Sequence, residues 1–320
     1  MEFTTKHIML KSIILGLILS AILILSACKK PTSPAVNTNP KLIFVYKMDS
    51  TQRRLNNFGN DTPMIAGHWG QNPVFHRMGA HYIEMDTTGL IAIGGGVVLY
   101  NTPMTSAGGS SAIDFTQEAF GNSGDTFFSV PISSVRPGNY PYLRVSLAYQ
   151  NFSVTFHWDT SFTYGGYPVT INGDFPSTIA SFIGINTYLT NYTISTQSVA
   201  VNGNKAQGYW GAETPITLSQ YNFTQTYVET GQAPPGSTTV VNPLFATSPI
   251  PAGSCLVTGS FSPSNLVITG KETHDIVVTV SLSTNQSFEW IDYNGNHKWD
   301  AMSGEPVVDM GVRGMIPYIN

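Results

Sequence analysis

Apolar and polar residues alternate along much of the chain from Lys41 onward. In two segments the alternating sets are Leu42, Phe44 and Tyr46 against Ile43, Val45 and Lys47, and Ile276, Val278, Val280 and Leu282 against Asp275, Val277, Thr279 and Ser281. A period of two places alternate side chains on one face of a β-strand. Strands of this kind are typical of antiparallel sheets that bury one face. The alternation therefore predicts an all-β domain.

The apolar positions change phase between Arg144 and Trp158. They carry odd numbers as far as Tyr149 and even numbers from Phe152 onward. A bulge or tight turn near Gln150-Asn151 would return both sets to one core face.

Further strand-like segments are separated by turns rich in Gly and Pro. They are Ala80–Met85, Ile91–Tyr100, Thr126–Val130, Ile194–Val201, Gln207–Trp210, Thr238–Val241 and Leu256–Phe261. Helical character is confined to Ser50–Asn57 and Thr178–Thr190. We therefore predict an antiparallel β-sandwich with little helix over residues 41–320, built either as one unit or as two packed sandwiches that divide near Thr160–Pro176.

The N-terminal segment has the pattern of an export signal. Lys6 and Lys11 precede an apolar run from Ile13 to Leu25, and small residues followed by Cys28 end the run. The run is shorter than the roughly 20 residues that a membrane-spanning helix needs. Its end resembles a bacterial lipobox, which implies a lipoprotein signal peptide over residues 1–27.

Cys28 is therefore the expected lipidation site. Its acyl chains would anchor the mature protein in a lipid bilayer, and residues 28–40 would form a flexible tether rich in proline and small polar residues. Lys29 follows Cys28 where the better-known enteric retention signal has aspartate, so we expect an outer-membrane lipoprotein. Both the periplasmic and the cell-surface leaflet stay open.

Composition narrows the function classes. Only 11% of the residues are charged, against about 25% in ordinary soluble domains. The formal net charge of -4 offers no basic patch, which argues against a nucleic-acid partner.

The chain has two cysteines. Acylation of Cys28 would leave Cys255 without an intrachain partner, and the apolar and small neighbours of Cys255 predict a buried strand residue.

The densest group of polar residues lies near the C-terminus. Side-chain oxygens recur at alternate positions in Asp292, Asn294, Asn296 and Asp300, and the carbonyl of Lys298 occupies the remaining alternate position. Ca²⁺ prefers six to eight oxygen ligands held in this way. The loop therefore resembles the calcium loops of EF-hand, dockerin and thrombospondin-type repeats.

The loop also departs from the EF-hand pattern. His297 stands where an EF-hand has glycine, and Ser303 stands where it has a bidentate acid. Glu305 or Asp309 would supply the missing carboxylate if the loop bends differently. The alternative is an Asx-rich turn without metal, because Asn, Asp and Gly form turns by themselves.

A second group of candidate ligands consists of His68, His76 and His81, with methionines nearby at positions 48, 64, 78 and 85. Copper accepts imidazole and thioether ligands. The histidine spacing fits no compact metal motif, and methionine fills cores for ordinary packing reasons.

Sequence signatures of enzymes are absent: the chain has no Gly-x-Ser-x-Gly elbow, His-Glu-x-x-His motif or phosphate loop. The scattered acids Glu84, Asp86, Asp114 and Glu118 are interpreted as solvated loop residues rather than as a glycosidase pair.

Three phrases carry a family resemblance: Gly79–Glu84, Pro137–Tyr140 leading to Leu143–Asn151, and Val308–Gly314. They resemble an uncharacterised family of lipoproteins from the Bacteroidota. The organisation is also distantly similar to MbnP-like periplasmic β-proteins, which are associated with copper handling. The Trp-x-Trp-x-x-Gly-Tyr segment of that family is missing here, so no copper ligand carries over.

Two functions follow as predictions. The first is a membrane-anchored, non-enzymatic binding or structural β-module that is stabilised by a calcium loop over residues 292–305 and has an unidentified protein or small-molecule ligand. The alternative is a periplasmic copper-binding protein of MbnP-like type that uses His68, His76 and His81.

Overall fold

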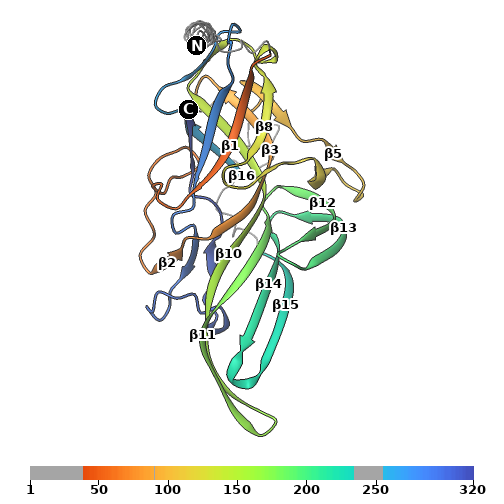
Figure 1. The fold of residues 1–320 in the computed structure, drawn as a ribbon, viewed down its shortest axis with the longest axis vertical. Helices are drawn as coiled ribbons and strands as arrows, with labels where there is room; N and C mark the ends of the chain where they lie inside the picture. The colour runs from red at the N-terminus through yellow and green to blue at the C-terminus, as the bar shows by residue number, and fades with distance from the viewer. Residues whose placement is uncertain (1–38, 90, 234–254) are drawn as a thin grey trace, which may run out of the picture. The chain divides into compact units, whose positions relative to one another are not determined.

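Strands make up nearly all of the regular structure (Figure 1). The computed structural model describes residues 39–89, 91–233 and 255–320, which fall within one structural unit, Asn39–Asn320. Among these residues the only helical pieces are three-residue 3₁₀ turns, such as Phe115–Gln117 and Ala301–Ser303. The predicted all-β fold with little helix is confirmed.

Several predictions concern residues outside the described part of the chain. They are the signal peptide, Cys28, nearly all of the tether and the strand expected at Thr238–Val241. None of the described residues lies in a helix long and apolar enough to cross a membrane.

One sheet joins the two ends of the domain. Its strands, in spatial order, are β21 (Met315–Ile319), β18 (Ile276–Ser283), β1 (Lys41–Asp49) and β8 (Thr126–Pro131). The central pair, β1 and β18, runs parallel, whereas the sequence predicted antiparallel neighbours. Period-two patterning reports which face is buried and not the direction of the neighbouring strand, so this difference could not be read from the pattern.

The largest sheet is built on the long strand β10 (Tyr142–Tyr164). In spatial order it contains β15 (Phe223–Gln232), β14 (Tyr209–Leu218), β11 (Tyr167–Phe182), β10, β3 (Val74–Asp86) and β4 (Val97–Asn101), with β16 (Cys255–Ser260) also on β10 and β7 (Ala119–Gly121) on β3. The β10–β3 register shifts at three places, one of them between Asn151 and Phe152. Val145 and Val154, from either side of the shifts, share one core, as the predicted bulge requires, whereas Tyr149 belongs to a second core.

Three smaller sheets complete the fold. They are β13 (Ser198–Ala206), β12 (Asn186–Thr193), β6 (Ala112–Asp114) and β5 (Met104–Thr105); β2 (His68–Gln71), β19 (Phe288–Ile291) and β20 (Val307–Asp309); and β17 (Leu266–Ile268) with β9 (Gly138–Tyr140). The main core contains residues from β1, β3, β10 and β18. A second core contains Phe182 and Tyr209 from the large sheet and Leu189 and Tyr192 from β12. It covers part of the other face of the large sheet.

Both helix predictions are wrong. Thr178–Thr190 contains the end of β11 and the start of β12, and Ser50–Asn57 is irregular apart from a bridge between Leu55 and Asp61. The end of β11 is buried on both faces, so apolar residues occupy both odd and even positions there and the strand period is lost. Strand ends also differ: only Val97–Asn101 of the expected Ile91–Tyr100 is a strand, and β13 begins at Ser198 rather than Ile194.

The segment where two sandwiches were expected to divide is the outer part of one hairpin. β10 and β11 pair without interruption from Tyr149 opposite Phe182 to Tyr164 opposite Tyr167. The turn is Gly165-Gly166, and both residues have positive φ, 56° and 84°. Two-residue hairpin turns of this type favour glycine.

Candidate functional site: an apolar groove and its Asx-rich wall

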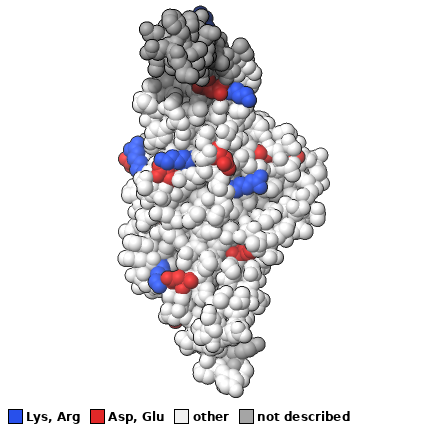
Figure 2. Space-filling view, viewed as in Figure 1, with Lys and Arg blue, Asp and Glu red and all other residues white. Residues whose placement is uncertain are grey.

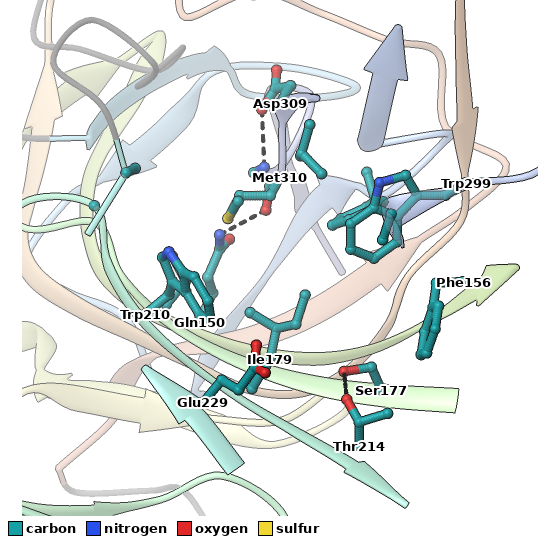
Figure 3. A pocket seen from close by; sticks show the side chains of 18 of the residues that line it. Gln150, Phe156, Ser177, Ile179, Trp210, Thr214, Glu229, Trp299, Asp309 and Met310 are labelled. Carbon is teal, nitrogen blue, oxygen red and sulfur yellow. Dashed lines mark hydrogen bonds between the residues drawn. The ribbon is translucent and has the colours of Figure 1, made fainter. Parts of the chain in front are cut away.

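The large sheet and the C-terminal segment enclose a groove of about 700 Å³ (Figure 3). Alternate residues of β14, among them Trp210, Ala212 and Ile216, face this groove. Residues between them, such as Tyr209, contribute to the second core on the other side of the sheet. The period of two that forms the strand therefore supplies both an inner packed face and an apolar groove face.

The lining is mostly apolar, with a few polar side chains. Ile179 and Phe156 extend the apolar surface, and Ser177 Oγ lies 2.8 Å from Thr214 Oγ1. Gln150 is fully buried, and its Nε2 donates a hydrogen bond of 2.6 Å to the Met310 carbonyl. Its Oε1 has no hydrogen-bond partner within the described residues.

Cys255 also lines the groove and is buried, as the sequence predicts for a strand residue. Burial raises the pKa of its thiol well above the ordinary range, and the nearby Asp309 acts in the same direction. The thiol therefore stays protonated and unreactive.

The opposite wall is the segment that follows β19. Trp299 is its central side chain: its ring centroid lies 4.7 Å from that of Phe288 and 6.3 Å from that of Phe156. The indole Nε1 donates to the Glu305 carbonyl at 3.3 Å, and the His157 N–H donates to the Trp299 carbonyl at 2.8 Å. These contacts attach the wall to β10.

The predicted calcium loop forms this wall, and most of its expected ligands come together. Asn294 Nδ2 and Asn296 Nδ2 each lie 2.7 Å from Asp300 Oδ2. The two carboxylate oxygens of Asp292 accept the backbone N–H groups of Gly295 and His297, at 2.9 and 3.1 Å.

The carboxylate that folds back on the loop is Glu305 and not Asp309. Glu305 accepts the N–H groups of Tyr293 and Asp300 at 3.0 and 2.9 Å, whereas Asp309 forms an ion pair with Arg313. The 3₁₀ turn at Ala301–Ser303 and the left-handed Gly304 reverse the chain between Asp300 and Glu305. Lys298 turns its ammonium group 3.1 Å from Asp174, so only its carbonyl remains as a possible ligand.

The donor set has the chemistry that Ca²⁺ prefers. Asp300 and Glu305 are buried, yet none of the ion pairs within the described residues involves Asp292, Asp300 or Glu305. Their hydrogen-bond donors are neutral N–H groups. The described residues contain no group of three His, Cys, Asp or Glu side chains placed to hold a metal ion. Cation binding would therefore also need the two asparagine amides, turned so that oxygen replaces nitrogen.

A buried charge cluster, Glu289 with Arg54, Arg313 and His68, lies behind the wall. The Glu289 carboxylate is 2.5 Å from each guanidinium and 2.6 Å from His68 Nδ1. Burial alone would raise the pKa of Glu289, but the hydrogen bond from His68 and the two cations lower it. Sequence reasoning missed this cluster because its members come from distant segments.

The three histidines proposed as copper ligands are not brought together. His68 binds Glu289, His76 Nε2 lies 2.7 Å from Ser153 Oγ, and His81 Nε2 lies 2.7 Å from Ser146 Oγ. His76 and His81 stand five positions apart in β3, and each lies at a register shift between β3 and β10, so the two imidazoles bond different serines of β10. Burial lowers the pKa of His81 to about 4.

The acids interpreted as solvated are mostly buried, so that interpretation is wrong for Glu84, Asp86 and Glu118. Glu84 and Asp86 share the buried Arg144 guanidinium, at 3.3 and 3.1 Å. Burial raises the pKa of Glu118 well above its ordinary value. Acids in β-strands look the same in sequence whether they face water or a buried partner.

Compared with models of known protein families, with curated proteins and with solved structures, the chain matches none. The resemblance to Bacteroidota lipoproteins and MbnP-like proteins therefore stays a prediction.

Proposed function

We propose that this protein is a non-enzymatic binding module that holds an apolar small molecule in the groove between the large sheet and the C-terminal wall. The groove carries the proposal. Its volume of about 700 Å³ lies within the range of ligand sites, about 300–1,000 Å³. Its apolar lining with a few polar groups, including the unpartnered Gln150 Oε1, is the composition typical of such sites.

Among the described residues that line the groove, none is an activated nucleophile, which favours binding over catalysis. The Ser177 hydroxyl bonds Thr214 rather than a base, and burial keeps the Cys255 thiol protonated. Nucleophilic catalysis needs an adjacent base or a lowered pKa.

In this proposal Ca²⁺ stiffens the C-terminal wall. Asp292, Asn294, Asn296, Asp300, Glu305 and the carbonyl of Lys298 would hold the ion. The proximity of both amides to Asp300 supports this part, and so does the absence, among the described residues, of an ion pair to Asp292, Asp300 or Glu305. The sequence supports an outer-membrane anchor through Cys28. No contact favours the copper alternative, because His68, His76 and His81 have separate partners.

Titration of the full chain with the apolar fluorophore N-phenyl-1-naphthylamine tests the groove. Ala212→Trp places an indole in the groove, and we expect it to weaken probe binding at least about tenfold because it occupies the ligand's volume. Ala200→Trp is the matched control, since Ala200 is exposed on β13, away from the groove lining. Equal probe binding by the two variants would contradict the proposal.

A further inference from the structure

The groove strands continue beyond the packed part of the sheet as two hairpins. β10 pairs with β3 only as far as Ser153, and β11 pairs with β14 only from Thr178 onward. The ends of β10 and β11 therefore form a two-stranded ribbon around Gly165-Gly166. One face of the ribbon, with Phe156, Ile171 and Phe175, packs in a small cluster with Ile216 of β14, whereas its other face is largely exposed.

Neither hairpin end carries a charged residue. Residues 160–173 and 214–228 contain no Asp, Glu, Lys or Arg. Exposed large apolar side chains gather there instead: Phe162, Tyr167, Tyr221, Phe223, Tyr227 and Val228. Figure 2 shows the charged side chains on this face of the molecule away from the end where the β10–β11 turn lies.

The two hairpins form one surface. The Tyr221 hydroxyl, beside the β14–β15 turn, accepts the Thr170 N–H of β11 at 3.0 Å. Tyr227 belongs both to this exposed surface and to the groove lining. We call the surface formed by the exposed residues of 160–173 and 214–228 the aromatic tip.

From this arrangement we propose that the aromatic tip docks on the surface of a lipid bilayer. Tyrosine and tryptophan side chains are enriched at the boundary between headgroups and acyl chains, and charged residues are costly in the hydrocarbon just below it. An uncharged tip with Phe162 and Tyr167 at its end fits that boundary. The docking is shallow, because the open strand edges present backbone groups that hydrocarbon cannot satisfy.

Continuity with the groove favours a bilayer over a protein partner. The strands that end in the tip also form the groove wall, so an apolar molecule leaving the bilayer would reach the groove along the same apolar surface. Edge-to-edge pairing with a protein partner would involve β15, the outermost strand of the large sheet among the described residues, rather than the tip. The proposal goes beyond the function proposed above, and groove binding does not depend on it.

The test places a fluorophore at the tip. In the full chain with Cys28→Ala, Thr163→Cys is labelled with a nitrobenzoxadiazole dye, since Cys255 is buried. Added phosphatidylcholine vesicles with nitroxide-bearing acyl chains should shift the emission to the blue and quench it. The same dye at Ser134→Cys, an exposed position away from the tip, should show neither change.

Two variants examine the aromatic residues. Phe162→Thr with Tyr167→Thr keeps strand-forming residues, and we expect it to raise the lipid concentration for half-maximal quenching at least about tenfold, because two apolar contacts are lost. Ile65→Thr with Val267→Thr removes exposed apolar residues elsewhere and should leave quenching unchanged.

Absence of quenching at position 163 overturns the proposal. Equal quenching at positions 163 and 134 also contradicts it. A third contradicting result would be that the chain self-associates, that the tip variant abolishes this self-association, and that vesicles have no effect. Probe binding by the tip variant is measured in parallel. If the tip variant still binds the fluorescent probe but its quenching by vesicles is lost, the tip and the groove act separately. Loss of probe binding by the wild-type groove would contradict the groove proposal alone.

Discussion

Two clusters of buried charge differ in the number of cations that each supplies. Glu289 and Asp309 are matched by two guanidinium groups, Arg54 and Arg313, with His68 as a further partner. In the other cluster, Glu84 and Asp86 share Arg144 alone.

The pKa of the carboxylates shifts in opposite directions in the two clusters. The pKa of Glu289 is lowered because hydrogen bonds and cations outweigh its burial. The pKa of Asp86 is raised to about 7, because burial and the charge of Glu84 outweigh Arg144. Glu84 instead uses backbone donors, the N–H groups of Gly94 and Gly96 at 2.9 and 2.8 Å. Burial raises the pKa in both clusters, and the number of nearby donors and cations decides whether that effect is overcome.

The Asx-rich loop extends the comparison. Within the described part of the chain, Asp292, Asp300 and Glu305 have no cationic side chain among their hydrogen-bond donors, and Lys298 is turned toward Asp174. The calcium ion proposed above would supply the positive charge that the protein supplies to Glu289. We call the Glu289 group the matched cluster and the Glu84–Asp86–Arg144 group the mismatched cluster. Glu289 of the matched cluster lies on β19, and the Asx-rich loop follows β19 and forms the groove wall.

The largest expected effect comes from breaking the matched cluster. Glu289→Gln keeps the side-chain shape but leaves Arg54 and Arg313 without their shared charge. Removing one partner of a buried ion pair costs about 3–5 kcal/mol, and we expect a loss of that size in the free energy of unfolding in urea.

Asp61→Asn is the matched control. It breaks the Arg53–Asp61 pair, whose side chains are 61% and 68% exposed, and exposed pairs contribute about 0–1 kcal/mol. Losses of equal size in the two variants would show that the matched cluster gives no special support.

The next effect concerns calcium. An ion that binds only the folded state adds about 2.7 kcal/mol when its free concentration is 100 times the dissociation constant. Wild type should lose this gain when EDTA is added, and Asp292→Ala and Asp300→Ala should lack it. The measurement is unfolding of the full chain in calcium and in EDTA.

Asp174→Asn is the control for the loop. Asp174 binds Lys298 and His157 but is no part of the donor set, so its variant should keep the calcium response. A wild-type protein insensitive to EDTA would leave the loop as a turn without metal.

Much of the fold was predictable from alternation. The pattern located β1, β18 and the bulge of β10, because each has one face against a core. It failed at Thr178–Thr190, where two cores cover both faces of β11 and the polar positions that mark a strand disappear. The hairpin at Gly165-Gly166 carried a usable signal, since paired glycines favour two-residue turns.

The site was only partly predictable. The loop residues lie close in sequence, so Asp292, Asn294, Asn296 and Asp300 could be grouped before the structure was known. The groove, the Glu289 cluster and the separate surroundings of His76 and His81 depend on which distant strands become neighbours. Local patterning carries no information about those contacts.

The smallest expected effect tests the mismatched cluster through pH. The pKa of Asp86 in the folded state is about 7, above the unfolded value of about 3.9. As pH rises from about 4 to 7, the unfolded chain releases this proton while the folded chain keeps it, so Asp86 lowers stability across that window. Asp86→Asn should remove this slope, a gain of about 2.5 kcal/mol at pH 8 relative to pH 5 when compared with wild type. Urea unfolding at several pH values gives the slope of stability against pH, which separates titration from any constant cost of altering the contact with Arg144.

Asp61→Asn, at an exposed carboxylate, should leave the wild-type slope in place. If Asp86→Asn also leaves it unchanged, Asp86 is ionised when folded, and one guanidinium is sufficient for two buried carboxylates.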